Sequence, residues 1–170
     1  MNYKLEYKPV GFGTDPDTKQ QYQGLTGPFF MSAYQRGYRW TEDEVQKLLT
    51  DIWESAMNET RHYSLQPIVV KKRSDDDWEL IDGQQRLTTL WLIFNYMHKS
   101  GYRRSGAAYH LEYETRPGSR DYLQTLDAQK ALENIDYFHL RGAHDAIEKW
   151  FDNRASTDQA KEALILRIYG

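Results

Sequence analysis

The sequence predicts an α+β domain, in which a small mixed sheet with flanking helices is followed by a helical C-terminal part. Two amphipathic helices, over residues 42–57 and 85–99, are indicated by apolar residues that recur at helical spacing. Short apolar or alternating runs typical of strands lie before, between and after these helices. With 170 residues, of which 39% are hydrophobic, the chain is long enough to bury a sizeable core.

The first half of the chain is expected to hold one well-marked helix after a long loop. Residues 11–27 are rich in glycine and proline and predict a loop, whereas residues 29–31 predict a short strand. The helix should begin after Thr41, because the run from Thr41 to Glu44 fits a capping box. Its apolar stripe consists of Val45, Leu48, Leu49, Ile52, Trp53 and Ala56.

Two strands, over residues 65–70 and 78–81, are predicted to form a hairpin that leads into the second helix. The run of aspartates between them lacks the glycine and the distal glutamate of a calcium loop, so we interpret it as a solvated turn. Asp82 and Gly83 mark the turn from the second strand into helix 85–99. The apolar residues of this helix are Leu87, Leu90, Trp91, Phe94 and Met97.

The last third of the chain is predicted to be mainly helical. Residues 107–115 alternate as a strand does, and residues 119–126 are expected to form a short helix. A longer helix is predicted over 135–151, and a second capping box indicates a final helix over 156–168.

Composition excludes several classes of function. The net charge of −3 provides no global basic field for nucleic acid, so any DNA contact needs a local patch or lies outside this segment. The absence of cysteine excludes disulfides, thiolate metal sites and cysteine nucleophiles, and it suits a reducing cytoplasm. No apolar run approaches membrane-spanning length, so we expect a cytoplasmic protein with no membrane partner. His139 and His144 lack the spacing of a helical metal pair and are interpreted as structural.

The strongest functional signal is the stretch from Ile81 to Leu90, which joins a strand to a helix. The first N–H groups of a helix have no partners within it, and its dipole is positive there, so this end attracts phosphate. Arg86 in the first turn is unfavourable against that dipole unless an anion is its partner. Because Asp-Gly is also a common hairpin turn, the local pattern leaves a solvated turn open as an alternative.

A second stretch, from Tyr34 to Trp40, places two arginines among three aromatic residues. Arginine stacked on aromatic rings is held rigid and can grip a phosphate or a base. A surface loop whose aromatic residues only cover the core is the alternative interpretation. We expect Arg36 of this loop and Arg86 to converge on one pocket, because both follow core elements and both need an anion.

Together these two stretches resemble the DGQQR-motif family, the N-terminal domain of GmrSD-type modification-dependent restriction enzymes and related phage-defence proteins. Residues 113–119 and 134–139 are also similar to later stretches of that family. The resemblance implies a ParB/sulfiredoxin-like nucleotide-binding domain over residues 1–115 and a helical extension over 116–170, truncated from a longer protein. Gly37 stands where the family usually has proline, and Ser32-Ala33 replaces a common Ile-Pro start, so a looser loop is expected.

The resemblance also implies a domain that binds and hydrolyses a nucleoside triphosphate, GTP or ATP with Mg²⁺, and that regulates a nuclease. Modified DNA would be reached through the full-length protein or a nuclease partner, and the nuclease is expected in a missing C-terminal domain. The implied nucleotide-binding residues are Gln35, Arg36, Gly83, Gln84, Gln85 and Arg86. The implied catalytic residues are Asp82, Gln84, Gln85 and Arg86, with Asp82 as the metal ligand.

Two other functions stay open at this point. The same site without turnover would make the domain a non-hydrolysing nucleotide sensor. A ParB-like nuclease acting on DNA itself is the third possibility, which the acidic net charge disfavours.

Overall fold

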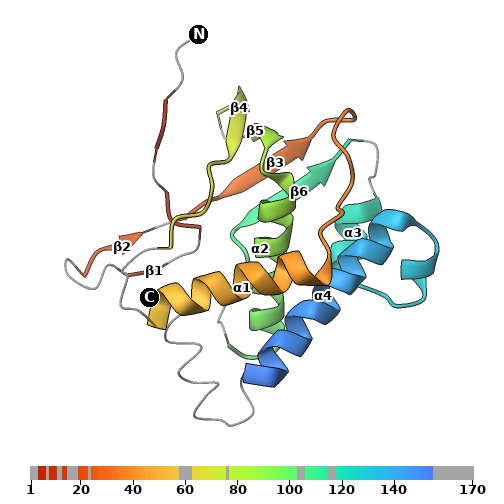
Figure 1. Ribbon diagram of the computed structural model, residues 1–170. Helices are drawn as coiled ribbons and strands as arrows, with labels where there is room; N and C mark the ends of the chain where they lie inside the picture. The colour runs from red at the N-terminus through yellow and green to blue at the C-terminus, as the bar shows by residue number, and fades with distance from the viewer. Residues whose placement is uncertain are drawn as a thin grey trace.

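The computed structural model confirms the predicted fold class, with a four-stranded mixed sheet, flanking helices and a long C-terminal helix (Figure 1). It describes residues 4–6, 8–10, 13–14, 19–22, 24–57, 63–75, 77–102, 106–114 and 118–154. The strands of the sheet are β3 (Gly27–Met31), β4 (Val69–Ser74), β5 (Asp77–Asp82) and β6 (Tyr109–Tyr113). The helices are α1 (Glu42–Met57), α2 (Gln84–Lys99), α3 (Gly118–Thr125) and α4 (Ile135–Arg154), with a 3₁₀ turn, η1, at Lys130–Leu132.

The order of strands in the sheet brings two distant parts of the chain together. The order is β4-β5-β3-β6, in which β3 runs parallel to both β5 and β6, and β4 runs antiparallel to β5. Phe29 of β3 pairs with Trp78 of β5 on one side and with Leu111 of β6 on the other. Because parallel strands end at the same edge of a sheet, the loop after β3 and the turn after β5 must be neighbours.

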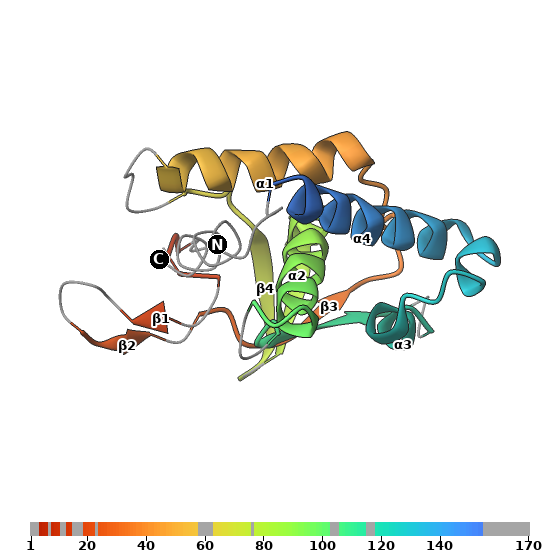
Figure 2. The same ribbon diagram turned by 90° about the horizontal axis from the view of Figure 1, so that it is seen from below.

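Helix α2 lies between the sheet and a layer formed by α1 and α4, as the two views in Figures 1 and 2 show. This position explains why α2 is buried on almost all sides, with residues such as Leu87, Ile93 and Met97 hidden from solvent. Tyr109 of β6 lies under it, fully buried, and donates a hydrogen bond of 2.6 Å to the carbonyl oxygen of Leu87. The helix that carries the central motif is therefore packed against the sheet on one side and against α1 and α4 on the other.

Some predicted elements are observed as predicted and others differ. Helix 42–57 has the predicted bounds, and Thr41 N donates to Glu44 Oε2 at 2.7 Å, as a capping box requires. The loop predicted over 11–27 contains a small antiparallel pair, β1 (Gly13–Thr14) with β2 (Gln21–Tyr22). The final helix predicted over 156–168 lies outside the described residues.

The strand predicted over 65–70 was wrong in its position, because β4 begins only at Val69. Pro67 has no N–H to donate to a strand ladder, which delays the start of the strand. Instead, the carbonyl oxygen of Pro67 and the side chain of Gln66 both accept hydrogen bonds from Arg86. Gln66 and Pro67, which were predicted to lie in a strand, thus contact the central motif through Arg86.

Residues on both sides of the predicted boundary at 115–116 share one hydrophobic core. Leu140, Ile147 and Trp150 of α4 belong to the same cluster of buried side chains as Leu49 of α1 and Met97 of α2. The division into 1–115 and 116–170 stays a prediction. Among the residues that the structure describes, no helix is both long and apolar enough to cross a membrane.

Candidate functional site

A pocket of about 330 Å³ lies at the sheet edge where the loop after β3 meets the turn after β5. All seven residues predicted for the site line it, together with two apolar residues that were not predicted. The lining residues are Gln35, Arg36, Trp40, Ile81, Asp82, Gly83, Gln84, Gln85 and Arg86. The expected convergence of Arg36 and Arg86 on one pocket is therefore confirmed.

Gly83 forms the N-cap of α2 and can only be glycine at low energy. Its φ is +98°, in the left-handed region that residues with a Cβ rarely adopt. A Cβ on Gly83 would also lie 2.5 Å from Cγ2 of Ile68. Because glycine has no side chain to cap the helix, and the first turn contains no acidic residue, this helix end receives no negative charge from its own first turn.

The two glutamines of the motif hold the facing loop. Gln85 is buried, and its amide uses both ends: Oε1 accepts from Arg39 N at 2.8 Å, while Nε2 donates to the carbonyl oxygen of Gly37 at 3.1 Å. Gln84 Nε2 donates to the carbonyl oxygen of Arg36. The first turn of α2 therefore binds the loop backbone at Arg36, Gly37 and Arg39, which fixes the backbone position of Arg36.

The loop is also attached to the sheet through Gln35. Its Nε2 donates to the carbonyl oxygens of Leu80 and Ile81 at the end of β5. Its Oε1 is buried and has no hydrogen-bond partner among the described residues. The looser loop expected from Gly37 stays a prediction. In the structure Gly37 is buried, and a Cβ there would overlap the carboxylate of Asp136.

The two arginines of the loop have different surroundings. Arg39 donates through Nη1 to the buried carboxylate of Asp136 on α4 and to the carbonyl oxygen of Tyr38, so its charge is neutralised within the protein. Arg36 is exposed and makes no ion pair with any residue in the described part of the chain. Only Arg36 of this pair thus offers an unneutralised charge to the pocket.

Arg86 is oriented by neutral groups. Its Nη1 donates to Oε1 of Gln66 and its Nη2 to the carbonyl oxygen of Pro67, both at 2.7 Å. Its Nε–H is buried without a partner, and no carboxylate of a described residue forms an ion pair with it. The guanidinium is therefore held in place while its positive charge stays uncompensated.

A buried hydrogen-bond chain supports this turn from behind. Thr89 Oγ1 donates to the carbonyl oxygen of Gln85 at 2.8 Å, so Tyr38 OH must be the donor in its 2.7 Å contact with Thr89 Oγ1. Burial raises the pKa of Tyr38, which keeps its hydroxyl protonated for this role. The loop and the helix are thus joined both inside the core and at the pocket.

The family model for the GmrSD restriction endonuclease, N-terminal domain, matches residues 18–167, which include both motifs and every residue of the pocket. The chain belongs to the GmrSD N-terminal domain family. Comparison with curated proteins gives no match, and neither does comparison with solved structures. The pocket therefore lies within the part of the chain that matches the GmrSD domain, and its ligand has to be argued from its own residues.

Sequence reasoning missed three kinds of residue around the pocket of this GmrSD domain. Trp40 and Ile81 lie inside the two motifs, but no local signal assigns them to the pocket. Gln66 and Pro67 have no local sequence signal, since only the tertiary structure brings them to Arg86. Asp136 lies in a stretch similar to the family, which was a signal that could have been followed.

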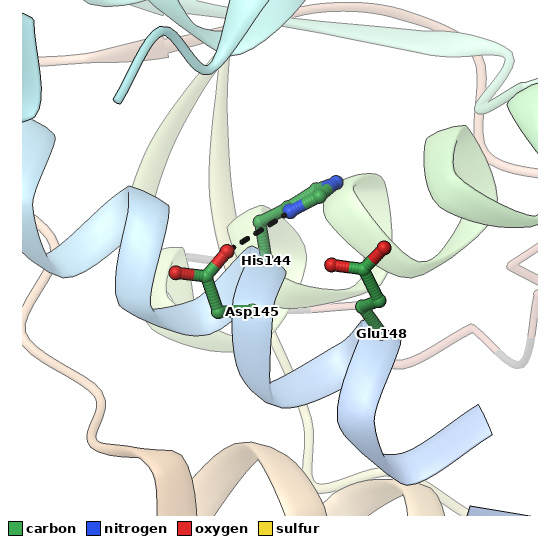
Figure 3. A group of neighbouring side chains, drawn as sticks. All are labelled: His144, Asp145 and Glu148. Atoms are coloured by element: carbon green, nitrogen blue, oxygen red, sulfur yellow. Dashed lines mark hydrogen bonds and ion pairs between the residues drawn. The ribbon is translucent and has the colours of Figure 1, made fainter. Parts of the chain in front are cut away.

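A second group of ligand-type side chains lies on α4, away from the pocket. His144, Asp145 and Glu148 project from this helix with ligand atoms that all lie within 4.8 Å of one another (Figure 3). Asp145 is already bound by Nε of Arg141 at 2.8 Å, and the ring of His144 packs edge-on against Tyr96. Since a protein cation occupies one of the three groups, we assign no metal to them, and the structural interpretation of His144 fits its packing.

Proposed function

We propose that this domain binds and hydrolyses a nucleoside triphosphate, GTP or ATP, with Mg²⁺, as the regulatory part of a modification-dependent restriction or phage-defence protein. One observation carries the proposal: Arg36 and Arg86 line the same pocket, and neither forms an ion pair with a described residue. Two uncompensated guanidinium groups in one pocket favour an anion, and their planar forks match phosphate oxygens.

The position of the pocket at the start of α2 supports phosphate as that anion. The helix dipole places a partial positive charge there, and the first N–H groups have no partner within the helix. Gly83, with its φ of +98°, allows the sharp turn from β5 into the helix that places these N–H groups beside the pocket. Helix end, backbone donors and two arginines would together bind several phosphate oxygens.

Asp82 suits the Mg²⁺ that would accompany such a ligand. Its carboxylate is exposed at the end of β5, lines the pocket, and has no hydrogen-bond or ion-pair partner among the described residues. Mg²⁺ is usually bound in this way, by one or two carboxylates together with phosphate oxygens and water. When bound, the ion would neutralise charge on the phosphates of the substrate.

Gln84 and Gln85 would position other groups of the site. Gln85 has no free amide atom and would act by holding the loop that carries Arg36. Gln84 uses Nε2 for the loop and keeps Oε1 as an acceptor that could orient an attacking water. Such positioning, together with electrostatic stabilisation, is the main source of catalysis in phosphoryl transfer.

The role in restriction rests on the family, whose name is that of a restriction endonuclease. The net charge of −3 argues against DNA binding by this domain itself. We therefore assign modified DNA to the full-length protein or to a nuclease partner. Nucleotide binding and hydrolysis in this pocket would then control when the nuclease acts.

The direct test is release of phosphate from GTP and from ATP by the purified chain, with Mg²⁺ and with a chelator. Turnover that needs Mg²⁺ and disappears in the Arg36→Ala, Arg86→Ala double variant supports the proposal. Binding without turnover would make the domain a nucleotide sensor instead. Absence of both binding and turnover would overturn the proposal, and nicking of a plasmid by the chain would favour a ParB-like nuclease.

A further inference from the structure

One side of the pocket is apolar, which the binding of phosphate does not explain. Trp40 and Ile81 are the two apolar side chains among the nine lining residues. Ile81 is 40% exposed, whereas its neighbour Leu80 in β5 is fully buried. Apolar surface left open beside two cationic groups indicates a ligand with both an anionic part and an apolar part.

We propose that Trp40 binds the nucleobase of the ligand by stacking on it, with Ile81 providing further apolar contact. This inference rests on the proposed function, because it assigns the base of the same nucleotide whose phosphates bind Arg36 and Arg86. A nucleobase is flat and uncharged, and an indole ring is the side chain with the largest flat π-surface. Stacking binds a base regardless of its hydrogen-bonding edge, so the inference does not distinguish guanine from adenine.

The position of Trp40 is suitable for such a role because the backbone next to it is fixed. Arg39 N donates to Gln85 Oε1, and the side chain of Arg39 is held by Asp136 of α4. The indole is half-buried and packs against the hydrophobic core, so only part of it faces solvent. A ring held in this way loses little conformational freedom when a base stacks on it.

Trp40 differs from the other tryptophans of the domain in its contact with the pocket. All five tryptophans of the chain are described, and only Trp40 lines the pocket. Trp91 and Trp150 are buried in the core, with 6% and 4% of their surface exposed. Trp53 forms an edge-to-face pair with Trp150 and so contributes to the contact between α1 and α4.

The test compares ligands with and without a base. Binding of GTP, ATP and inorganic tripolyphosphate is measured by calorimetry for the wild-type chain and for Trp40→Leu and Trp40→Phe. Tyr34→Leu is the matched control, because Tyr34 is an aromatic residue of the same loop that is 69% exposed and does not line the pocket. Thermal melts of each variant establish that it is folded.

We expect Trp40→Leu to weaken GTP and ATP binding about tenfold or more while the affinity for tripolyphosphate stays within about twofold. Trp40→Phe should lie between Trp40→Leu and the wild type, since a smaller ring stacks less. Tyr34→Leu should match the wild type with all three ligands. In the wild type, nucleotides should bind more tightly than tripolyphosphate.

Two results would overturn this inference and leave the proposed function intact. One is equal binding of nucleotides and tripolyphosphate by the wild type, which would mean that the base contributes nothing. The other is a loss in Trp40→Leu that is not specific to nucleotides: an equal loss for all three ligands would make Trp40 a structural residue, and no loss for any of them would mean that Trp40 does not contribute to binding. A wild type that binds none of the three ligands would overturn the proposed function and this inference together.

Discussion

Helices α1 and α2 have the same length, 16 residues, but their N-termini are built with opposite charge. The first turn of α1 contains Glu42, Asp43 and Glu44, and Glu44 reaches back to the N–H of Thr41. The first turn of α2 has a glycine cap, no acidic residue, and Arg86. One helix satisfies its positive end with its own side chains, whereas the other adds a further positive charge to it.

This difference shows that the start of α2 is not optimised for the stability of the domain alone. Carboxylates in the first turn stabilise a helix by about 0.3–1 kcal/mol each, and a cation there has the opposite effect. The same chain uses the favourable arrangement in α1, so the unfavourable one in α2 has to be offset by something else. A bound anion would provide that compensation, and the following changes test the contrast between the two helix ends.

Gly83→Ala should have the largest effect, because it alters the cap of α2 itself. The left-handed φ of +98° and the overlap of a Cβ with Ile68 should together lower the free energy of unfolding by about 3 kcal/mol. Urea denaturation measures this change. Gly101→Ala is the control, since Gly101 has a φ of +78° but open space around its Cβ position, and about 1 kcal/mol is expected there. Equal losses at both positions would show that the contact with Ile68 is unimportant.

Asp82→Asn should separate binding from turnover at the same helix end. The amide keeps the size of the side chain but loses the charge that a hard cation needs, so Mg²⁺-dependent hydrolysis should fall roughly a hundredfold. Nucleotide affinity without Mg²⁺ should be nearly unchanged. Phosphate release and calorimetry measure the two quantities, with the exposed Asp75→Asn as control. Unchanged turnover would reduce Asp82 to a turn residue.

Arg86→Ala should weaken nucleotide binding about ten- to a hundredfold, because a charge-assisted contact with phosphate contributes about 1.5–3 kcal/mol. Without ligand, the lost hydrogen bonds to Gln66 and Pro67 and the relieved conflict with the helix dipole should nearly cancel. Thermal melts with and without nucleotide measure both effects, and Arg120→Ala serves as a control at an exposed arginine. A large loss of stability in the absence of ligand would identify Arg86 as a structural residue.

Glu44→Gln in α1 should have the smallest effect. The change removes one negative charge from a helix end that has three, so the free energy of unfolding should fall by about 0.5 kcal/mol. Nucleotide affinity should not change, because Glu44 does not line the pocket. Denaturation and calorimetry measure the two quantities. A change in affinity at this position would remove the distinction between the two helix ends.

The sequence by itself determined the features that depend on neighbouring residues. The helix predicted over 42–57 was confirmed at both ends, because its cap and its apolar stripe are local signals. The two motifs also predict seven site residues from the sequence, and all seven line one pocket. The start of β4 and the pair of short strands near the N-terminus were missed, because pairing partners and the role of Pro67 are not local.

Only the tertiary structure decided how those residues divide their roles. The parallel pairing of β3 with β5 brings the loop of Arg36 beside the start of α2, although nothing in either stretch specifies the other. Asp136, far along the chain on α4, neutralises Arg39 and leaves Arg36 as the loop arginine with an uncompensated charge. Charge compensation and amide pairing depend on which groups meet in space, and that is set by the packing of the sheet and the helices rather than by sequence spacing.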